Sequence, residues 1–371
     1  MSAPRPHIHA HTALRGVAAL VVVGYHLRFG AEMLLPAEEA TRLFERGYLF
    51  VDFFFLLSGF VLCYVYEPRG LPTPRAVLRF YRARIARVWP LHVLTLLVLV
   101  GFALATLLYE RVTASPGSAY RAAWDALPFQ LTLTHAWGML PAARWNVPSW
   151  SISAEAFAYL LFPALLWAQR RASAAFAVLG VLAAAAFYAR IAVTTGDLDI
   201  TVGTALLRCL AGFVLGMALY QLRALADALP GRAVSALQLA GVAMVLLLIE
   251  RVGNDVALLP PFAALVLLTA SDRGLLSRLL RPRWLQRLGE WSYAIYLTHV
   301  PILIIGSFAF ERVARAVGMD GEPGTRVLWI LLVYAATLLV SAVTYERFEK
   351  PARAFLLRGR PAPPPSLVPA P

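Results

Sequence analysis

The chain has 371 residues, of which 60% are hydrophobic and only 15% are charged. Soluble domains carry about 25% charged residues, and the apolar residues here come in long blocks, which excludes an ordinary water-soluble fold and fits the bilayer as the solvent. The formal net charge of +13 does not indicate a nucleic-acid partner, because the basic residues lie in short segments between the apolar blocks.

Ten apolar segments of roughly 16–22 residues have about the length that a helix needs to cross a bilayer. They cover residues 12–29, 47–66, 88–109, 148–168, 172–190, 200–220, 233–250, 256–271, 288–308 and 326–345. The strongly basic connections fall on alternate loops, and the positive-inside rule places such loops in the cytoplasm. The sequence therefore predicts an all-α polytopic membrane protein with about ten transmembrane helices, both termini in the cytoplasm, in the cell membrane.

Two parts of the chain look non-helical. Residues 110–147 are predicted to form a long outer loop whose semi-apolar stretch, 127–137, lies at the membrane interface or re-enters the membrane. Residues 1–350 are predicted to form the membrane domain, and residues 351–371 a cytoplasmic, Pro-rich, disordered tail.

The first two spans carry ionisable residues, which are costly inside a bilayer. Arg15 and His26 are eleven residues apart, so they share one helix face at a separation of about 16 Å along the axis. An interfacial arginine with a histidine bonded between helices is one interpretation, and a general base at His26 is the other. In the second span, Ser58-Gly59 fits a small-residue helix contact, while Asp52 stays open between a structural and a functional role.

The basic segment before the third span is RAVLRFYRARIARVW, residues 75–89. Its arginines fit a cytoplasmic anchor under the positive-inside rule. That rule explains their positive charge but not why so many lie in so short a segment. Planar guanidinium groups also bind phosphate in pairs of hydrogen bonds. A cytoplasmic anchor and a polyphosphate site both remain open for Arg82, Arg84 and Arg87.

The fourth span places Ser151, Glu155 and Tyr159 on one helical face, at positions i, i+4 and i+8. A carboxylate two turns into the membrane needs a partner or a raised pKa, which favours a functional role for Glu155. In the ninth span, Ser292 and His299 also share a face. That pair fits either an interhelical hydrogen-bond network or catalysis.

These segments together resemble the acyltransferase family 3, membrane-bound O-acyltransferases that modify sugars of polysaccharides, lipopolysaccharide and some natural products. The resemblance covers about residues 12–350 and rests on six segments in the family's order. They are Arg15 with His26, Val51–Phe60, the arginines before Trp89-Pro90, Trp150–Glu155 with Tyr159, Ser292-Tyr293 through His299, and Tyr345-Glu346 through Glu349-Lys350-Pro351. The chain departs from the family pattern in having Ala156 and Ala158 after the motif glutamate.

The resemblance implies transfer of an acyl group, usually acetyl, from acyl-CoA to a hydroxyl of a carbohydrate-type acceptor, with no permanently bound cofactor. It gives His26 the role of base or transient acyl carrier. The predicted catalytic residues are His26, Glu155, Ser292, Tyr293 and His299, with Ser292, Tyr293 or Tyr296 available to donate to the oxyanion. The predicted substrate-binding residues are Arg15, Arg82, Arg84, Arg87, Asp52, Ser151 and Tyr159.

Two further expectations limit the alternatives. Cys63 and Cys209 both lie inside apolar segments, so we expect neither a disulfide nor a metal site. The rival class is a transporter or flippase of a lipid-linked glycan precursor, which would show inverted repeats and paired broken helices. Neither is visible in the sequence.

Overall fold

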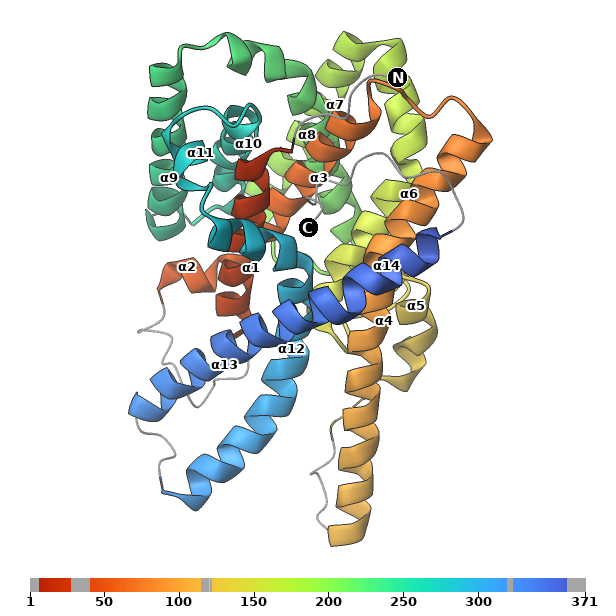
Figure 1. Ribbon diagram of the computed structural model, residues 1–371, viewed down its shortest axis with the longest axis vertical. Coiled ribbons are helices and arrows are strands. Elements are labelled where there is room, and N and C mark those ends of the chain that lie inside the picture. The colour runs from red at the N-terminus through yellow and green to blue at the C-terminus, as the bar shows by residue number, and fades with distance from the viewer. Residues whose placement is uncertain are drawn as a thin grey trace.

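A computed structural model describes residues 7–27, 41–114, 120, 122–251, 253–318 and 323–358. Within these ranges the chain is helical and contains no strand (Figure 1). The helices are α1 (His9–Leu27), α2 (Arg42–Glu45), α3 (Phe50–Tyr66), α4 (Pro74–Thr113), α5 (Leu127–Leu131), α6 (Trp150–Arg171), α7 (Ser173–Thr194), α8 (Ala205–Ala228), α9 (Gly231–Arg251), α10 (Leu259–Thr269), α11 (Leu275–Leu279), α12 (Arg283–Ala316), α13 (Pro323–Thr344) and α14 (Lys350–Leu357). Short 3₁₀ turns precede α3, α5, α6 and α10, and a π-helical turn, Tyr345–Glu349, joins α13 to α14.

The predicted membrane helices are present. Nine helices in the described ranges are long and apolar enough to cross a bilayer, and they cover nine of the ten predicted spans. The remaining span, 256–271, is a shorter apolar helix, Asp255–Thr269. It begins as a 3₁₀ turn capped by the Asn254 side chain, and two prolines open α10. The all-α polytopic fold is therefore confirmed, and the placement of both termini in the cytoplasm stays a prediction.

Helix α4 differs most from its predicted span, 88–109. It starts at Pro74, behind a Thr73 side chain that accepts a hydrogen bond from the Ala76 backbone N–H, and it runs for 40 residues. Proline suits the first turn of a helix, where its missing N–H is not needed. The arginine segment is therefore part of this helix instead of a loop.

The predicted disordered tail is partly wrong. Residues 351–357 belong to α14, which follows the π-helical turn directly. Residues 359–371 lie outside the described part of the chain. The helical part of the chain therefore extends past residue 350 by about two turns.

The segment 127–137 turns back along α4. The Trp89 indole N–H donates to the Leu131 carbonyl at 2.9 Å, and a His92 ring nitrogen lies 2.9 Å from the Gln130 carbonyl. The chain leaves α4 at Thr113 to enter this segment, whereas Trp89 and His92 lie in the first half of α4, about 30 Å from that end along the helix axis. These contacts favour re-entry over an interfacial position. His92 and His135, for which the sequence offers no partner, stack in parallel with ring centroids 5.6 Å apart.

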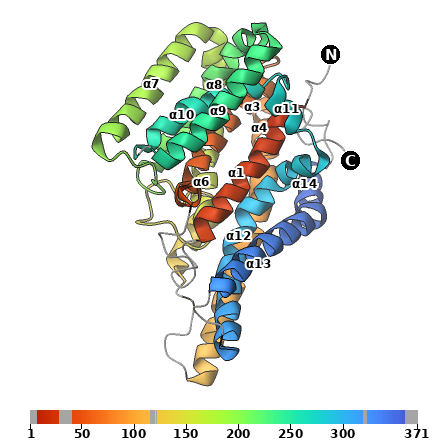
Figure 2. The same ribbon diagram turned by 90° about the vertical axis from the view of Figure 1, so that its left-hand side faces the viewer.

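The helices form a bundle from which α4, α12 and α13 extend toward one end, as Figures 1 and 2 show. Two helix pairs cross closely at glycines. A Cβ atom on Gly289 of α12 would overlap the Thr12 carbonyl of α1, and one on Gly59 of α3 would overlap the Phe213 carbonyl of α8. Small residues allow backbones to approach this closely in membranes. The first crossing aligns the Arg15–His26 face of α1 with α12.

Gly59→Ala tests the second crossing. The added methyl meets backbone atoms of α8, so the helices must move apart, and overpacking of this kind costs about 1–3 kcal/mol. We expect a lower thermal unfolding midpoint of the purified protein in detergent. Gly101→Ala in α4 is the matched control, because a Cβ there has open space and alanine favours a helix. Equal midpoints for the two variants would contradict the close α3–α8 crossing.

Candidate active site

Eight of the twelve predicted site residues line one cavity of about 200 Å³, which we call the arginine cavity. They are Arg15, Arg84, Arg87, Ser151, Glu155, Tyr159, Ser292 and Tyr293. They come from α1, α4, α6 and α12, while α3 supplies a mostly apolar wall. Residues more than 270 positions apart in the sequence therefore converge on one site.

Three predicted arginines lie at this cavity with different partners. The Arg84 guanidinium lies 5.8 Å from the Tyr159 ring centroid. Arg87 lies 5.0 Å from the Tyr293 ring centroid and forms an ion pair with buried Glu349. The Nε atoms of Arg15 and Arg84 are buried, and neither has a hydrogen-bond partner among the described residues. The three arginines line a cavity in which Glu155 is the one acidic side chain among the described lining residues, and this excess of positive charge favours the binding interpretation over a simple topology anchor.

Arg82 does not join them. Its guanidinium donates to the Leu356 carbonyl of α14 at 3.2 Å, and Arg82 does not line the arginine cavity. Arg84 and Arg87 are three residues apart and share a helix face, whereas a step of two residues turns Arg82 away. Arg82 therefore binds α14 and does not lie at the predicted substrate site.

Glu155 has a hydrogen-bond partner from α3. The Ser58 hydroxyl donates to a Glu155 carboxylate oxygen at 2.5 Å. Ser151 and Tyr159 line the same cavity, so the face predicted for α6 is present. The sequence favoured a small-residue helix contact for Ser58 and Gly59. The structure separates them, with Gly59 at the helix crossing and Ser58 at the carboxylate.

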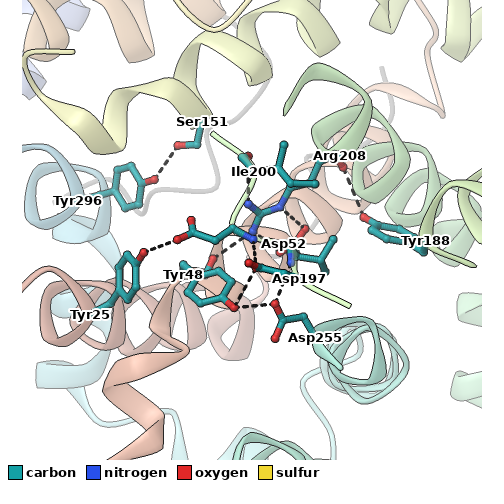
Figure 3. Close-up of polar contacts among 12 residues, drawn as sticks. Tyr25, Tyr48, Asp52, Ser151, Tyr188, Asp197, Ile200, Arg208, Asp255 and Tyr296 are labelled. Atoms are coloured by element: carbon teal, nitrogen blue, oxygen red, sulfur yellow. Dashed lines mark hydrogen bonds and ion pairs between the residues drawn. The ribbon is translucent and has the colours of Figure 1, made fainter. Parts of the chain in front are cut away.

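Tyr296 forms a wall between the arginine cavity and a second cavity, since Tyr296 and Val51 line both. Its hydroxyl lies 2.7 Å from the Ser151 hydroxyl, and each of the two hydroxyls also contacts the Pro148 carbonyl. Figure 3 shows the Ser151–Tyr296 contact. These hydrogen bonds fix the ring between the two spaces.

The second cavity, of about 750 Å³, contains His26, and we call it the histidine cavity. Its other lining residues include two carboxylates and many aromatic rings: Asp199, Glu311, Tyr25, Tyr48, Phe102, Tyr120, Trp150, Tyr296 and Phe308. The Tyr25 hydroxyl donates to Asp199 at 2.7 Å. Arg15 and His26 thus lie on one face of α1, as predicted, but serve different cavities.

His26 packs against His299, with ring centroids 4.9 Å apart. The Nδ1 atom of each ring lies 3.0 Å from the carbonyl four residues earlier, Val22 for His26 and Ile295 for His299. A carbonyl only accepts, so each Nδ1 carries the proton and each Nε2 is the basic nitrogen. His299 is fully buried behind His26, and its Nε2 has no partner among the described residues.

Asp52 lines neither cavity, contrary to its predicted role in substrate binding. Its carboxylate accepts two hydrogen bonds from Arg208 of α8, at 2.6 and 3.0 Å, and both side chains are buried. Arg208 also donates to the Tyr48 and Ile200 carbonyls (Figure 3). Its guanidinium lies 5.2 Å from the Trp150 ring centroid. Burying an arginine in the membrane costs enough free energy to predict that it has a charged partner. The sequence alone does not identify Asp52 as that partner.

Two further cavity residues escaped the sequence prediction. Arg353 of α14 lines the arginine cavity, and it was missed because α14 falls in the segment predicted to be a disordered tail. Tyr66 lines the same cavity at the end of α3. The four-residue step from Glu349 to Arg353 is the signal that could have placed Arg353 on an inward helix face.

Comparisons with known proteins agree on one family. The family model described as an acyltransferase domain matches residues 8–346. The chain is 30% identical to the acyltransferase MdmB of Streptomyces mycarofaciens, over 97% of this chain and 96% of that protein. It is 23% identical to the peptidoglycan O-acetyltransferase OatA of Listeria monocytogenes, over 94% of this chain but 56% of that protein. No solved structure matches the chain.

Asp52→Asn tests the structural role of Asp52. The variant leaves Arg208 buried without its counter-charge, and breaking a buried pair in this way costs about 3–5 kcal/mol. We expect a loss of folded, monodisperse protein on size exclusion and a lower thermal midpoint. Replacing both partners, Asp52→Leu with Arg208→Met, removes the unpaired charge and restores most of the stability. A stable Asp52→Asn variant that only weakens substrate use would return Asp52 to the binding site.

Proposed function

The chain belongs to the acyltransferase family 3 and is a multi-pass membrane acyltransferase, and on this basis we propose that it moves an acyl group, acetyl in the simplest case, from acyl-CoA to a hydroxyl of a glycan or other glycosylated acceptor. We place this activity in the cell membrane. The observation that carries the proposal is the pair of cavities that meet at Tyr296, one rich in arginine and the other holding His26.

The arginine cavity is the proposed donor site. Guanidinium groups match phosphate oxygens in geometry and charge, and coenzyme A is rich in phosphate. A volume of about 200 Å³ is below the roughly 300–1,000 Å³ of pockets that enclose a drug-sized ligand. We therefore propose that the cavity encloses only the thioester arm, with the nucleotide at the arginines. Glu155, held by Ser58, has further lone pairs for the amide N–H groups of that arm.

The histidine cavity is the proposed acceptor site. Its volume of about 750 Å³ suits a ligand of one or a few rings. Aromatic faces with carboxylate and hydroxyl groups at their edges, here Asp199, Thr201 and Ser307, can stack on a sugar ring and accept from its hydroxyls. The name of the relative from Listeria monocytogenes, a peptidoglycan O-acetyltransferase, supports a glycan hydroxyl as the nucleophile.

The chemistry follows from the protonation of His26. Its basic Nε2 takes the proton of the acceptor hydroxyl, the oxygen attacks the thioester carbonyl, and the carbon–sulfur bond breaks to release the coenzyme A thiol, which regains a proton. Alternatively, Nε2 carries the acyl group between donor and acceptor. The hydroxyls of Tyr296 and Ser151 lie 2.7 Å apart at the wall, and one of them can donate to the oxyanion in place of the Pro148 carbonyl to which it now donates.

The structure changes the partner proposed for His26. Glu155, the predicted catalytic acid, is too far to orient the His26 imidazolium, because the two side chains line different cavities. His299 is the neighbouring ring instead. Because a buried neighbour without an acid partner cannot stabilise a positive charge by attraction, we propose that His299 fixes the orientation of His26. The transporter alternative is set aside by the family assignment.

His26→Gln tests the catalytic assignment. Glutamine keeps polarity but takes no proton near pH 7, so both His26→Gln and His26→Ala should lower turnover by roughly 10²–10⁴-fold. Turnover is measured as thiol release from acetyl-CoA by purified protein with a glycan acceptor. His9→Gln, at an exposed histidine, is the control. A folded His26→Gln enzyme with near-normal turnover would remove His26 from the mechanism and leave Glu155 or His299 as the next base to test.

A further inference from the structure

The arginine cavity receives a fourth guanidinium from the C-terminal helix. Arg353 of α14 lines the cavity beside Arg15, Arg84 and Arg87. These four cations come from three helices, α1, α4 and α14, that lie far apart in the sequence. The first three match motifs of the family, whereas Arg353 lies beyond residue 346, where the family match ends. Its role at this site is therefore a separate question.

The charge at this cavity is unbalanced among the described residues. Glu155 is the one acidic side chain among the described residues that line the cavity with the four arginines, and it accepts from the Ser58 hydroxyl, while Glu349 pairs with Arg87 beside the cavity. Guanidinium groups gathered in a membrane protein repel one another and lose hydration, a cost that an anion can offset. The cavity therefore fits an anion with several acceptor oxygens.

The placement of α14 is fixed by contacts at both of its ends. The ion pair of Glu349 with Arg87 ties the end of the π-helical turn to α4. Arg82 of α4 holds the other end through the Leu356 carbonyl. Arg353 lies between these two ties, one turn after Glu349, so it projects from the face of α14 that packs on α4. Single π-turns of this kind are frequent at functional sites.

We propose that Arg353 binds a phosphate group of the acyl donor and that α14 is part of the donor site. Glu349 is a positioning residue that holds Arg87 for the same ligand. This inference rests on the proposed function, since it takes the donor to be a coenzyme A thioester. Coenzyme A offers a pyrophosphate and a 3′-phosphate, and either group fits a planar guanidinium.

Equilibrium binding of coenzyme A to the full-length protein in lipid-free detergent tests the proposal. Loss of one charge-assisted contact should weaken binding by about tenfold to 150-fold in Arg353→Ala. Arg347→Ala is the matched control, because it removes the same charge from an exposed side chain on the preceding turn, outside the cavity, and should change the affinity less than twofold. Arg353→Lys keeps the charge and should recover part of the affinity. Thermal midpoints show whether each variant is folded.

A second ligand identifies the phosphate group. If Arg353→Ala loses the preference for coenzyme A over 3′-dephospho-coenzyme A, Arg353 binds the 3′-phosphate; if both ligands weaken equally, it binds the pyrophosphate. Either result supports the proposal. A folded Arg353→Ala that binds coenzyme A as Arg347→Ala does overturns it, and this is also the result expected if Arg353 contacts a lipid headgroup. A wild-type protein that does not bind coenzyme A would instead overturn the proposed donor, and this inference with it.

Discussion

The buried ion pair between Asp52 and Arg208 is the constraint on which both cavities depend. It joins α3 to α8 inside the bundle, and Arg208 also binds the Tyr48 and Ile200 carbonyls and lies against Trp150. Such a pair is stable only while every donor is satisfied. It therefore fixes the start of α3, which lines both cavities at Val51, and the start of α6, which carries Ser151 and Glu155.

With the helices held in this way, the site offers separate spaces for the proposed donor and the proposed acceptor. Arginines and a narrow space suit an anionic donor with a thin reactive arm, whereas aromatic rings and carboxylates suit a hydroxyl-rich acceptor. Tyr296 and Val51 lie between the two spaces, and Tyr296 is held by hydrogen bonds to Ser151 and Pro148. In the proposed reaction the acyl carbon of the donor must reach this wall to meet the acceptor hydroxyl. A wall that holds bulk water back from the thioester would limit its hydrolysis.

Features that lie on a single helix could be predicted from the sequence, because helix geometry fixes which residues share a face. This holds for Ser151, Glu155 and Tyr159, and for Arg15 with His26. Partners from different helices could not be predicted. Arg208 lies 156 residues from Asp52, and Ser58 lies 97 residues from Glu155. Helix α14 was missed because a short charged helix next to a Pro-rich segment has no apolar span to mark it, and its order depends on tertiary contacts with α4.

The most direct test of the two-cavity arrangement is a structure of the full-length protein with S-ethyl-coenzyme A, a thioether that mimics acetyl-CoA but cannot react. The arrangement predicts phosphate density at Arg15, Arg84, Arg87 and Arg353, and the ethyl group against Tyr296, directed toward His26 across the wall. A nucleotide bound in the histidine cavity, or an ethyl group that ends away from Tyr296 and Val51, would contradict it.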